Sequence, residues 1–439
     1  MNFLSSAACP PLPSEEFIRR ILIDRVDDRQ LSLGMIVGTT EAKNHTIVPY
    51  GRCDISTGKV INERTIFEIG SVTKLFTALL LSDMVNRGEV KLEEPVVDLL
   101  PAGTRVPVRN GRAITLRDLA SHYSGLPRLP TNFAPKDPKD PYADYTENEL
   151  YQFLETYELV RTPGDTFEYS NLGVGLLGHA LVLRAGCADY ESLVRSRILA
   201  PLRMDDTFVR IPPGFLGSVA TGHDDNLDPV PNWNLDVLAG AGGLRSNLSD
   251  LLLFMDALCD PEQTSIGSMI SPLVKPLSQG GLGLLPTPHY DGPTSISHAG
   301  GTGGFSSFVG CIPEWKRGIV CLSNSGIPAI ADLAVHVLDP RWGMHWYRKE
   351  ADVDPSQFAR LLGRYRLGPN HVFQVTSTAD RLYVQLTGQQ ALRAFPASEW
   401  HFFYKAVGAQ ITFEPDAGGR AARLILHQNS CDQIADRIE

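Results

Sequence analysis

Strand-like segments stand at both ends of the first 345 residues, and helical patterns occupy the region between them. SLGMIVGTT (32–40) and HTIVPYG (45–51) predict one pair of strands, and SSFVGCIPE (306–314) and RGIVCLSN (317–324) predict another. Helical patterns lie between the two pairs, at 114–121, 146–156, 172–186, 189–199 and 247–259. This order predicts one antiparallel sheet built from both ends of the region, with a helical region inserted. The fold class is therefore α+β.

The pattern changes near residue 350. Short β-type runs, separated by Gly, Asp and Pro turns, continue to the C-terminus: HVFQVTS, RLYVQLT, WHFFYKA, AQITFEP and RLILHQN. Closely spaced short strands predict a small antiparallel β-barrel or sandwich. We interpret residues 351–369 as the linker that leads into it. The chain is thus expected to hold two domains, at 1–345 and 350–439.

Composition argues against several classes of partner. The net charge is -10 and no Lys/Arg-rich block is present, so a nucleic-acid partner is not expected. The sequence contains no run of about 18 apolar residues, so no membrane span is predicted. Seven cysteines without a CxxC pair are typical of reduced thiols in a cytoplasmic protein, and no secretory signal pattern is evident. Trimming of an upstream segment would instead allow a periplasmic or secreted protein. The oligomeric state is left open.

A serine and a lysine three residues apart open a strongly apolar helical run, FEIGSVTKLFTALLL (67–81). Serine is a weak nucleophile that needs a base within hydrogen-bond reach. Helix positions i and i+3 lie on one face, so Ser71 and Lys74 can meet. The same spacing recurs at Ser56 and Lys59, where Gly58 and polar neighbours predict an exposed turn. The spacing alone therefore does not identify a catalytic pair.

The surroundings of Lys74 separate the two sites. The helix that follows Ser71 is apolar on nearly every side, which predicts burial. A lysine on a buried helix is costly unless it is paired or functional, and burial beside another cation would lower its pKa toward that of a neutral base. The alternative is a capping serine followed by a lysine whose ammonium group reaches solvent. Both interpretations remain open at this point.

Two further segments carry groups suited to acyl transfer. In EYSNLG (168–173), Tyr169 can shuttle a proton if cations depress its pKa, and the Asn171 amide suits a lysine or a substrate amide. In SISHAGGTGGF (295–305), His298 stands just before a predicted strand, and Gly300 and Gly301 let backbone approach a ligand. The alternatives are a core tyrosine beside a capping asparagine, and a glycine-rich loop with an incidental histidine. A nucleotide loop is not predicted, because GGTGGF lacks the Gly-Lys-Ser/Thr ending.

Taken together, Ser71-x-x-Lys74, Tyr169-x-Asn171 and His298-x-Gly300 resemble the three motifs of the serine β-lactamase and penicillin-binding-protein superfamily. The similarity is greatest to class C β-lactamases and their D,D-peptidase and esterase relatives. Flanking phrases also resemble family segments, among them ITLRDLASHYSGLP (114–127), LAPLRMDDTF (199–208) and AGAGGLRSNLSDLLLFM (239–255). The resemblance covers residues 15 to 345. The last ninety residues resemble the lipocalin-like β domain appended to some of these hydrolases.

The resemblance implies catalytic roles. Ser71 would be the acylated nucleophile, with Lys74 and Tyr169 as base and proton relay. Asn171 would position Lys74 and the substrate. Backbone N–H groups of Ser71 and Gly301 would form the oxyanion hole.

His298 departs from the motif that many members carry, which has a lysine at this position. Lysine offers a permanent charge to a substrate carboxylate, whereas histidine is mostly neutral at pH 7. Members with H-x-G tend to be D-peptidases, esterases or acyltransferases with weak β-lactamase activity. Strong reliance on a substrate carboxylate, as in efficient β-lactam hydrolysis, is therefore not expected.

We expect a serine hydrolase that forms an acyl-enzyme on Ser71 and acts on a small-molecule or peptide substrate, either a D-amino-acid peptide or amide or a β-lactam. The first alternative is a carboxylesterase or acyltransferase, including a peptide-cyclising thioesterase, which a cytoplasmic location favours. The second is a penicillin-recognising sensor without turnover. No cofactor and no metal are expected, because His371, His401 and His427 are dispersed and are interpreted as structural. The absence of a GxSxG motif argues against an α/β-hydrolase.

Overall fold

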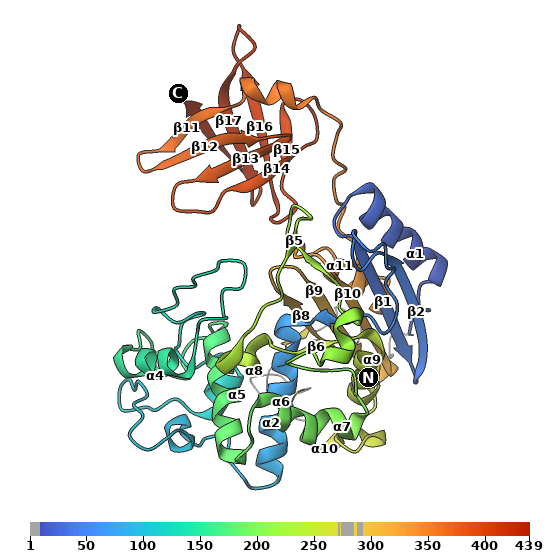
Figure 1. The fold of residues 1–439 in the computed structure, drawn as a ribbon, viewed down its shortest axis with the longest axis vertical. Helices are drawn as coiled ribbons and strands as arrows, with labels where there is room; N and C mark the ends of the chain where they lie inside the picture. Colours follow the sequence, from blue (N-terminus) through green and yellow to red (C-terminus); the bar gives the residue numbers. More distant parts are fainter. Residues whose placement is uncertain (1–8, 271–272, 274–284, 288–292) are drawn as a thin grey trace, which may run out of the picture. The chain divides into compact units, whose positions relative to one another are not determined.

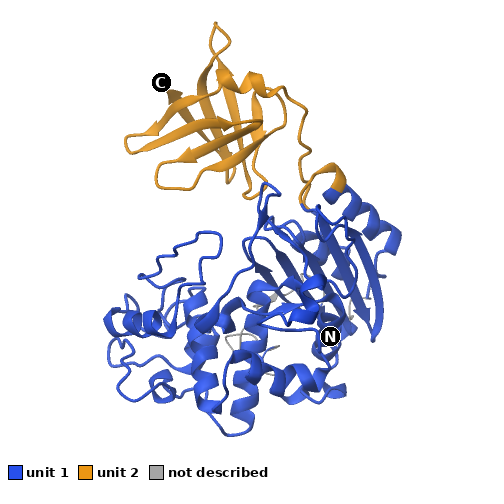
Figure 2. Cartoon of the chain, in the orientation of Figure 1, with its two compact units in different colours: residues 1–26, 32–344 blue, residues 27–31, 345–439 orange. Residues whose placement is uncertain are grey.

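The computed structural model describes residues 9–270, 273, 285–287 and 293–439 (Figure 1). The chain forms two compact units, which Figure 2 shows in different colours. Unit 1 comprises residues 1–26 and 32–344, and unit 2 comprises residues 27–31 and 345–439. A mixed sheet-and-helix body makes up unit 1, and a β-barrel makes up unit 2.

An antiparallel sheet of six strands, in the order β2-β1-β10-β9-β8-β7, runs through unit 1 (Figure 1). Its strands are β1 (Gly34–Glu41), β2 (Asn44–Gly51), β7 (Leu285–Thr287), β8 (Ser295–Gly301), β9 (Ser306–Ile312) and β10 (Arg317–Ser323). The N-terminal strand β1 pairs with β10, so that Met35 lies opposite Ser323. Every residue of β9 and β10 is buried, which explains why both read as near-continuous apolar runs. The sheet joins the two ends of unit 1, as the sequence predicts.

Helices fill the region between β2 and β7 and also pack against the sheet. They are α1 (Glu15–Ile23), α2 (Thr73–Asn86), α3 (Leu116–Ala120), α4 (Glu147–Thr156), α5 (Asn171–Ala185), α6 (Tyr190–Val194), α7 (Ala200–Leu202), α8 (Ala239–Gly242), α9 (Leu248–Cys259), α10 (Gly267–Ile270) and α11 (Ala331–Leu338). Two short strand pairs, β3 (Phe67–Glu68) with β6 (Arg245–Ser246) and β4 (Gly222–His223) with β5 (Pro229–Val230), complete unit 1. An ion pair between the buried Arg25 and the partly buried Asp332 ties the chain after α1 to α11.

Helices α2 and α5 form the centre of the helical region. All residues of α2 from Thr73 to Met84 are buried, in keeping with its all-round apolar sequence. Helix α5 lies very close to α8. A Cβ atom on Gly178 would lie only 3.0 Å from the Cα atom of Gly240. Ser170 caps α5 by accepting the N–H of Gly173, and Gly186 ends it with φ 64°. These contacts hold α5 tightly against α8 and fix where α5 begins.

Unit 2 is a closed antiparallel barrel, because the first strand pairs with the last. Its strands are β11 (Gly363–Gly368), β12 (His371–Thr378), β13 (Arg381–Leu386), β14 (Leu392–Pro396), β15 (His401–Phe403), β16 (Ala409–Pro415), β17 (Ala421–Gln428) and β18 (Cys431–Arg437). Inward-facing side chains such as Tyr365, Phe402 and Phe413 are buried and contact one another edge to face. Aromatic rings thus fill the interior.

Several predictions about local structure need correction. His298 and Gly300 lie within strand β8 and not before a strand, because pairing with β9 holds this glycine-rich segment extended. Residues 351–369 contain strand β11 and are not only a linker. Helix α1 was not among the predicted helices. The strands predicted at both ends of unit 1, the helical region between them and the exposed turn at Ser56 are confirmed.

All seven cysteines are free. No group of three or more His, Cys, Asp or Glu side chains within the described ranges could hold a metal ion. Considering the same ranges, no single helix is long and apolar enough to cross a membrane. Helix α5 and the segment 190–202 pass that test only as a pair, which is bent by 74°. Helix α5 itself is buried in unit 1.

Candidate active site

Ser71 lies on a tight turn that joins β3 to α2. Residues Gly70–Val72 form a single 3₁₀ turn, and the α-helix begins at Thr73. Gly70 adopts φ +47°, and a Cβ atom there would lie 2.7 Å from the carbonyl oxygen and 2.8 Å from the nitrogen of Gly301. Only glycine suits both the backbone conformation and the close approach. The turn that carries Ser71 is therefore pressed against strand β8.

Lys74 lies within hydrogen-bonding distance of Ser71, one turn further along the helix. Its Nζ atom is 3.0 Å from Ser71 Oγ and donates to the carbonyl oxygen of Ala241 at 2.6 Å. The residue is 2% exposed. Burial, assisted by the Arg128 cation, lowers the pKa of Lys74 well below its usual value. A lysine in this environment can be neutral and accept the proton of Ser71 Oγ.

Tyr169 lies on the other side of the nucleophile. The Ser71 side chain interacts with its hydroxyl group and opposes the rise of its pKa, and Lys74 Nζ lies 5.0 Å from the centre of its ring. The sequence suggested that Tyr169 could shuttle a proton if nearby cations depressed its pKa. Instead, burial raises the pKa of Tyr169, and the opposing effects of the Ser71 hydrogen bond and Arg128 do not overcome it. Tyr169 is therefore a protonated phenol at neutral pH, suited to donating a proton.

His122 packs against the ring of Tyr169. It was not among the predicted site residues. The two rings are 4.5 Å apart, and His122 Nδ1 accepts the backbone N–H of Ser170 at 3.1 Å. Burial, together with Lys74 and His298, lowers the pKa of His122 to about 3. A neutral imidazole is required here, because a protonated Nδ1 could not accept this hydrogen bond. His122 thus fixes the segment that carries Tyr169.

Asn171 begins α5 beside Tyr169. Its backbone N–H donates to the carbonyl oxygen of Arg128 at 3.1 Å, and its side-chain amide donates to the Tyr142 hydroxyl at 3.1 Å. The amide oxygen is buried and has no partner among the described residues. We expected Asn171 to hold Lys74, but the carbonyl of Ala241 takes that place. The unpartnered oxygen leaves Asn171 available to a donor on a substrate.

Strand β8 forms the opposite wall of the site. Gly300 must be glycine, because a Cβ atom would collide with the carbonyl oxygen of Ile69 and the hydroxyl of Ser307. Gly301 is open, with nothing nearer than 3.9 Å to its Cβ position. Among the described residues, β7 pairs only with Ser295–Ser297, so the outer edge of β8 from His298 onward has no strand beside it.

His298 Nδ1 lies 2.8 Å from the carbonyl oxygen of Ala299, so this nitrogen carries the proton. Burial and the neighbouring Lys74 lower the pKa of His298 to about 4. The imidazole is therefore neutral at pH 7, as the sequence predicts for a histidine at this position. Its other nitrogen, Nε2, can still accept one hydrogen bond.

The duplicate Ser-x-x-Lys pattern is arranged quite differently. Ser56 and Lys59 are exposed, Ser56 Oγ donates to Asp54, and Lys59 Nζ donates to the backbone of Gly217. Ser56 and Lys59 do not hydrogen-bond with each other, whereas Ser71 and Lys74 do. Of the two pairs, only Ser71 and Lys74 provide a nucleophile next to a buried amine.

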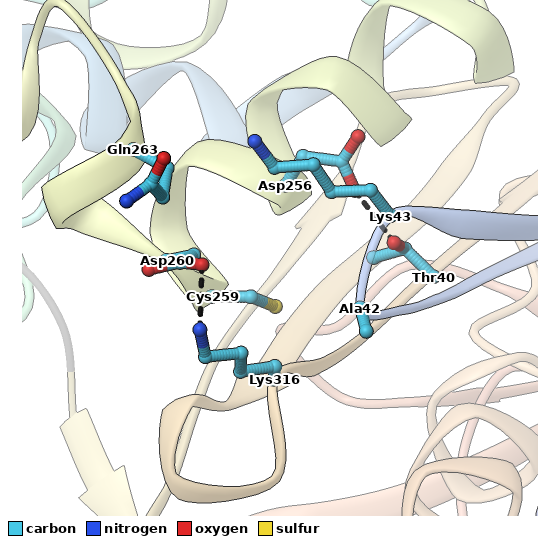
Figure 3. Close-up of a pocket in the computed structure, with 8 residues that line it drawn as sticks. All are labelled: Thr40, Ala42, Lys43, Asp256, Cys259, Asp260, Gln263 and Lys316. Carbon is cyan, nitrogen blue, oxygen red and sulfur yellow. Dashed lines mark hydrogen bonds and ion pairs between the residues drawn. The ribbon is translucent and has the colours of Figure 1, made fainter.

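A separate pocket of about 340 Å³ lies between the β1–β2 turn, the end of α9 and the β9–β10 turn. Figure 3 shows its lining, in which Lys316 pairs with Asp260 and Thr40 with Asp256. The Ser307 hydroxyl donates to the carbonyl oxygen of Ile69, two residues before Ser71, and Ser307 stands near the start of β9. Lys316 lies in the turn after the end of β9. At about 3.3 Å per residue, the pocket is roughly 20 Å from Ser71. It belongs to another part of unit 1.

The chain is similar to several known proteins. A family model described as "Beta-lactamase" matches residues 19–337, and a second, a domain of unknown function (DUF3471), matches residues 347–436. A β-lactamase of Escherichia coli (strain K12) is 27% identical over 76% of this chain and 97% of its own length. Penicillin-binding protein 4* of Bacillus subtilis (strain 168) is 26% identical over 89% of this chain and 91% of its own.

Two further similarities complete the comparison. The D-alanyl-D-alanine-carboxypeptidase/endopeptidase AmpH of Escherichia coli (strain K12) is 28% identical over 72% of this chain and 86% of its own. The crystal structure of a class C β-lactamase from Rhodobacter sphaeroides superposes with a TM-score of 0.60 at 24% identity. It covers 74% of this chain and 98% of that one, and it shows the fold alone. On the family match, which spans most of the sequence, this chain belongs to the β-lactamase family of serine hydrolases.

Proposed function

We propose that Ser71 forms an acyl-enzyme with the carbonyl group of a peptide or amide, in particular a D-amino-acid peptide, or of a β-lactam. The observation that carries the proposal is the buried Lys74 amine, 3.0 Å from Ser71 Oγ and with a pKa well below its usual value. Similarity to β-lactamases and to a D-alanyl-D-alanine-carboxypeptidase supports this substrate class.

In the proposed reaction, Ser71 Oγ attacks the substrate carbonyl while Lys74 accepts its proton. The N–H groups of Ser71 and Gly301, on two segments in direct contact, stabilise the oxyanion. The Tyr169 phenol then donates a proton to the leaving nitrogen, and the protonated Lys74, which lies beside Tyr169, returns a proton to the phenolate. Water attacks the ester in the second half-reaction, with the same groups acting in reverse. The Asn171 amide oxygen accepts an N–H of the substrate.

A fluorescent penicillin and intact-protein mass spectrometry test the acyl-enzyme. We expect one adduct on the wild-type protein and none on Ser71→Ala. The chain offers a matched control, Ser56→Ala, which removes the serine of the exposed duplicate pair and should leave the adduct unchanged. Equal adduct yield on Ser71→Ala would overturn the assignment.

A second candidate is a carboxylesterase or acyltransferase that uses the same site. The neutral His298 favours it, because strand β8 offers no permanent cation to the carboxylate of a β-lactam or of a C-terminal D-amino acid. Product analysis with an added amine or alcohol distinguishes hydrolysis from acyl transfer. Hydrolysis alone supports a peptidase or esterase, whereas transfer of the acyl group to the added nucleophile supports an acyltransferase.

A further inference from the structure

Arg128 lies at the mouth of the site without a role in the proposed chemistry. It belongs to the proline-rich loop 126–141, and its side chain is exposed. The guanidinium carbon lies 5.3 Å from the centre of the Tyr169 ring. Its backbone carbonyl accepts the N–H of Asn171, which fixes the loop to the start of α5. Both ends of the residue are thus held against groups that line the site.

Burial lowers the pKa values of the other basic groups around Ser71 and so favours their neutral forms. Burial lowers the pKa of Lys74 well below its usual value, and the pKa values of His122 and His298 fall to about 3 and about 4 for the same reason. An arginine side chain stays protonated in proteins. Arg128 is therefore the group that supplies lasting positive charge beside Tyr169 and Asn171.

Carboxylates neutralise other arginines in this part of unit 1 but not Arg128. Arg161 pairs with Glu168, next to Tyr169, and the buried Arg245 pairs with Glu68. Within the described ranges, no carboxylate forms an ion pair with Arg128. The Arg128 guanidinium is exposed and lies on an aromatic face, and no side chain or backbone group among the described residues accepts a hydrogen bond from it. A guanidinium in this position is a ready partner for a planar anion.

We propose that Arg128 binds a carboxylate of the substrate and so selects anionic substrates for acylation of Ser71. The inference rests on the proposed acyl-enzyme function and assigns it a substrate class. It places the recognising cation on the Tyr169 side of the site, whereas the motif resemblance would have placed it on β8. The carboxylate can stand on the acyl group or on the leaving group, and the two are distinguished by experiment.

Four activated esters test the proposal. For the acyl side, the pair is the mono-4-nitrophenyl ester of glutaric acid and 4-nitrophenyl valerate, which share a leaving group and chain length. For the leaving-group side, the pair is 4-carboxyphenyl valerate and its methyl ester. The measured quantity is the ratio of kcat/KM for the charged ester to that for its neutral partner. Because charge-assisted hydrogen bonds are strong, Arg128→Gln should lower this ratio about ten- to hundredfold in one pair.

Three further variants test whether the change in selectivity is specific to the guanidinium group of Arg128. Lys136→Gln removes one exposed positive charge from the same loop and should leave both ratios unchanged. Arg128→Lys keeps the charge but loses the planar fork, so an intermediate ratio is expected. Arg128→Glu should reverse the preference, toward the 4-nitrophenyl ester of 4-(trimethylammonio)butyrate over 4-nitrophenyl valerate. The exposed position of Arg128 predicts that all variants fold, which thermal unfolding checks.

The outcomes separate this proposal from the proposed function. Equal losses on charged and neutral esters in Arg128→Gln would overturn substrate recognition and leave Arg128 only an electrostatic effect on Lys74. Unchanged ratios in both pairs would also overturn it, while the acyl-enzyme would stand. If Ser71→Ala cleaved the esters as fast as the wild-type protein, the proposed function would fail, and the selectivity assigned to Arg128 would fail with it.

Discussion

Replacing Gly70 by alanine tests whether the contact between the Ser71 turn and strand β8 builds the site. The new Cβ atom would lie 2.7 and 2.8 Å from two backbone atoms of Gly301, whereas carbon atoms in contact prefer about 3.5 Å. The turn and the strand must therefore move apart by roughly 0.5 Å or more. Alanine at φ +47° costs about 1–2 kcal/mol, and the overlap about 1–3 kcal/mol more.

A matched control stands at the other end of the same helix. Gly88 adopts φ +73°, and a Cβ atom there would meet nothing within 4 Å. Gly88→Ala carries the backbone cost of about 1–2 kcal/mol but not the overlap. Both changes affect the unfolded chain alike, so this effect cancels in the comparison. The difference between the two variants isolates the contact with β8.

The assay combines denaturant unfolding with the rate of acylation by an activated ester. Gly70→Ala should be less stable than Gly88→Ala by about 1–3 kcal/mol. It should also acylate about tenfold more slowly, since a misplacement of 1 Å can cost about a hundredfold. Gly88→Ala should acylate at the wild-type rate. Equal stabilities and equal rates for the two variants would refute the idea that β8 positions Ser71.

Further predictions concern the site and the buried pair of Arg245 and Glu68. Lys74→Ala should lose most acylation, by about a hundredfold or more, while Tyr169→Phe should lose leaving-group protonation, so that amides suffer more than activated esters in steady-state kinetics. His122 has a folded pKa of about 3 against 6.5, so the folded state binds fewer protons and stability falls as the pH drops below about 6.5. This group alone should cost about 2 kcal/mol between pH 7 and pH 5, and unfolding of His122→Asn at both pH values should show a drop smaller by that amount. Arg245→Met should destabilise the protein by about 3–5 kcal/mol in denaturant unfolding, because it leaves the buried Glu68 unpaired, and a second change, Glu68→Gln, should restore part of the loss.

Features with a local signal could be predicted from the sequence. The spacing of Ser71 and Lys74 on an all-round apolar helix predicted a buried lysine beside a serine, and both lie as expected. The apolar runs of β9 and β10 and the series of short β-type runs after residue 350 gave equally clear signals. In each case the signal is carried by neighbouring residues, through periodicity or composition.

Contacts between distant segments could not be predicted in this way. Ala241 holds Lys74 through a backbone carbonyl, which any residue would supply, so no side chain marks its role. Strand β8 has glycine where β-formers are expected, and it is extended because β9 pairs with it and the Ser71 turn packs against it. The raised pKa of Tyr169 depends on burial that the local sequence does not reveal.

The pairing of β1 with β10 has a consequence for synthesis of the protein. Strand β1 ends at Glu41, but its partner does not begin until Arg317, so a ribosome needs roughly half a minute to supply it. Throughout that interval the nascent chain holds only the β2 side of β1 paired and presents an open strand edge, on which aggregation can start. A translation product that stops before Arg317 would contain the serine, the lysine and the tyrosine of the site and still lack the frame that holds β9 and β8 against them. Yield in cells should therefore depend on chaperones that shield this edge until the last strand of the sheet emerges.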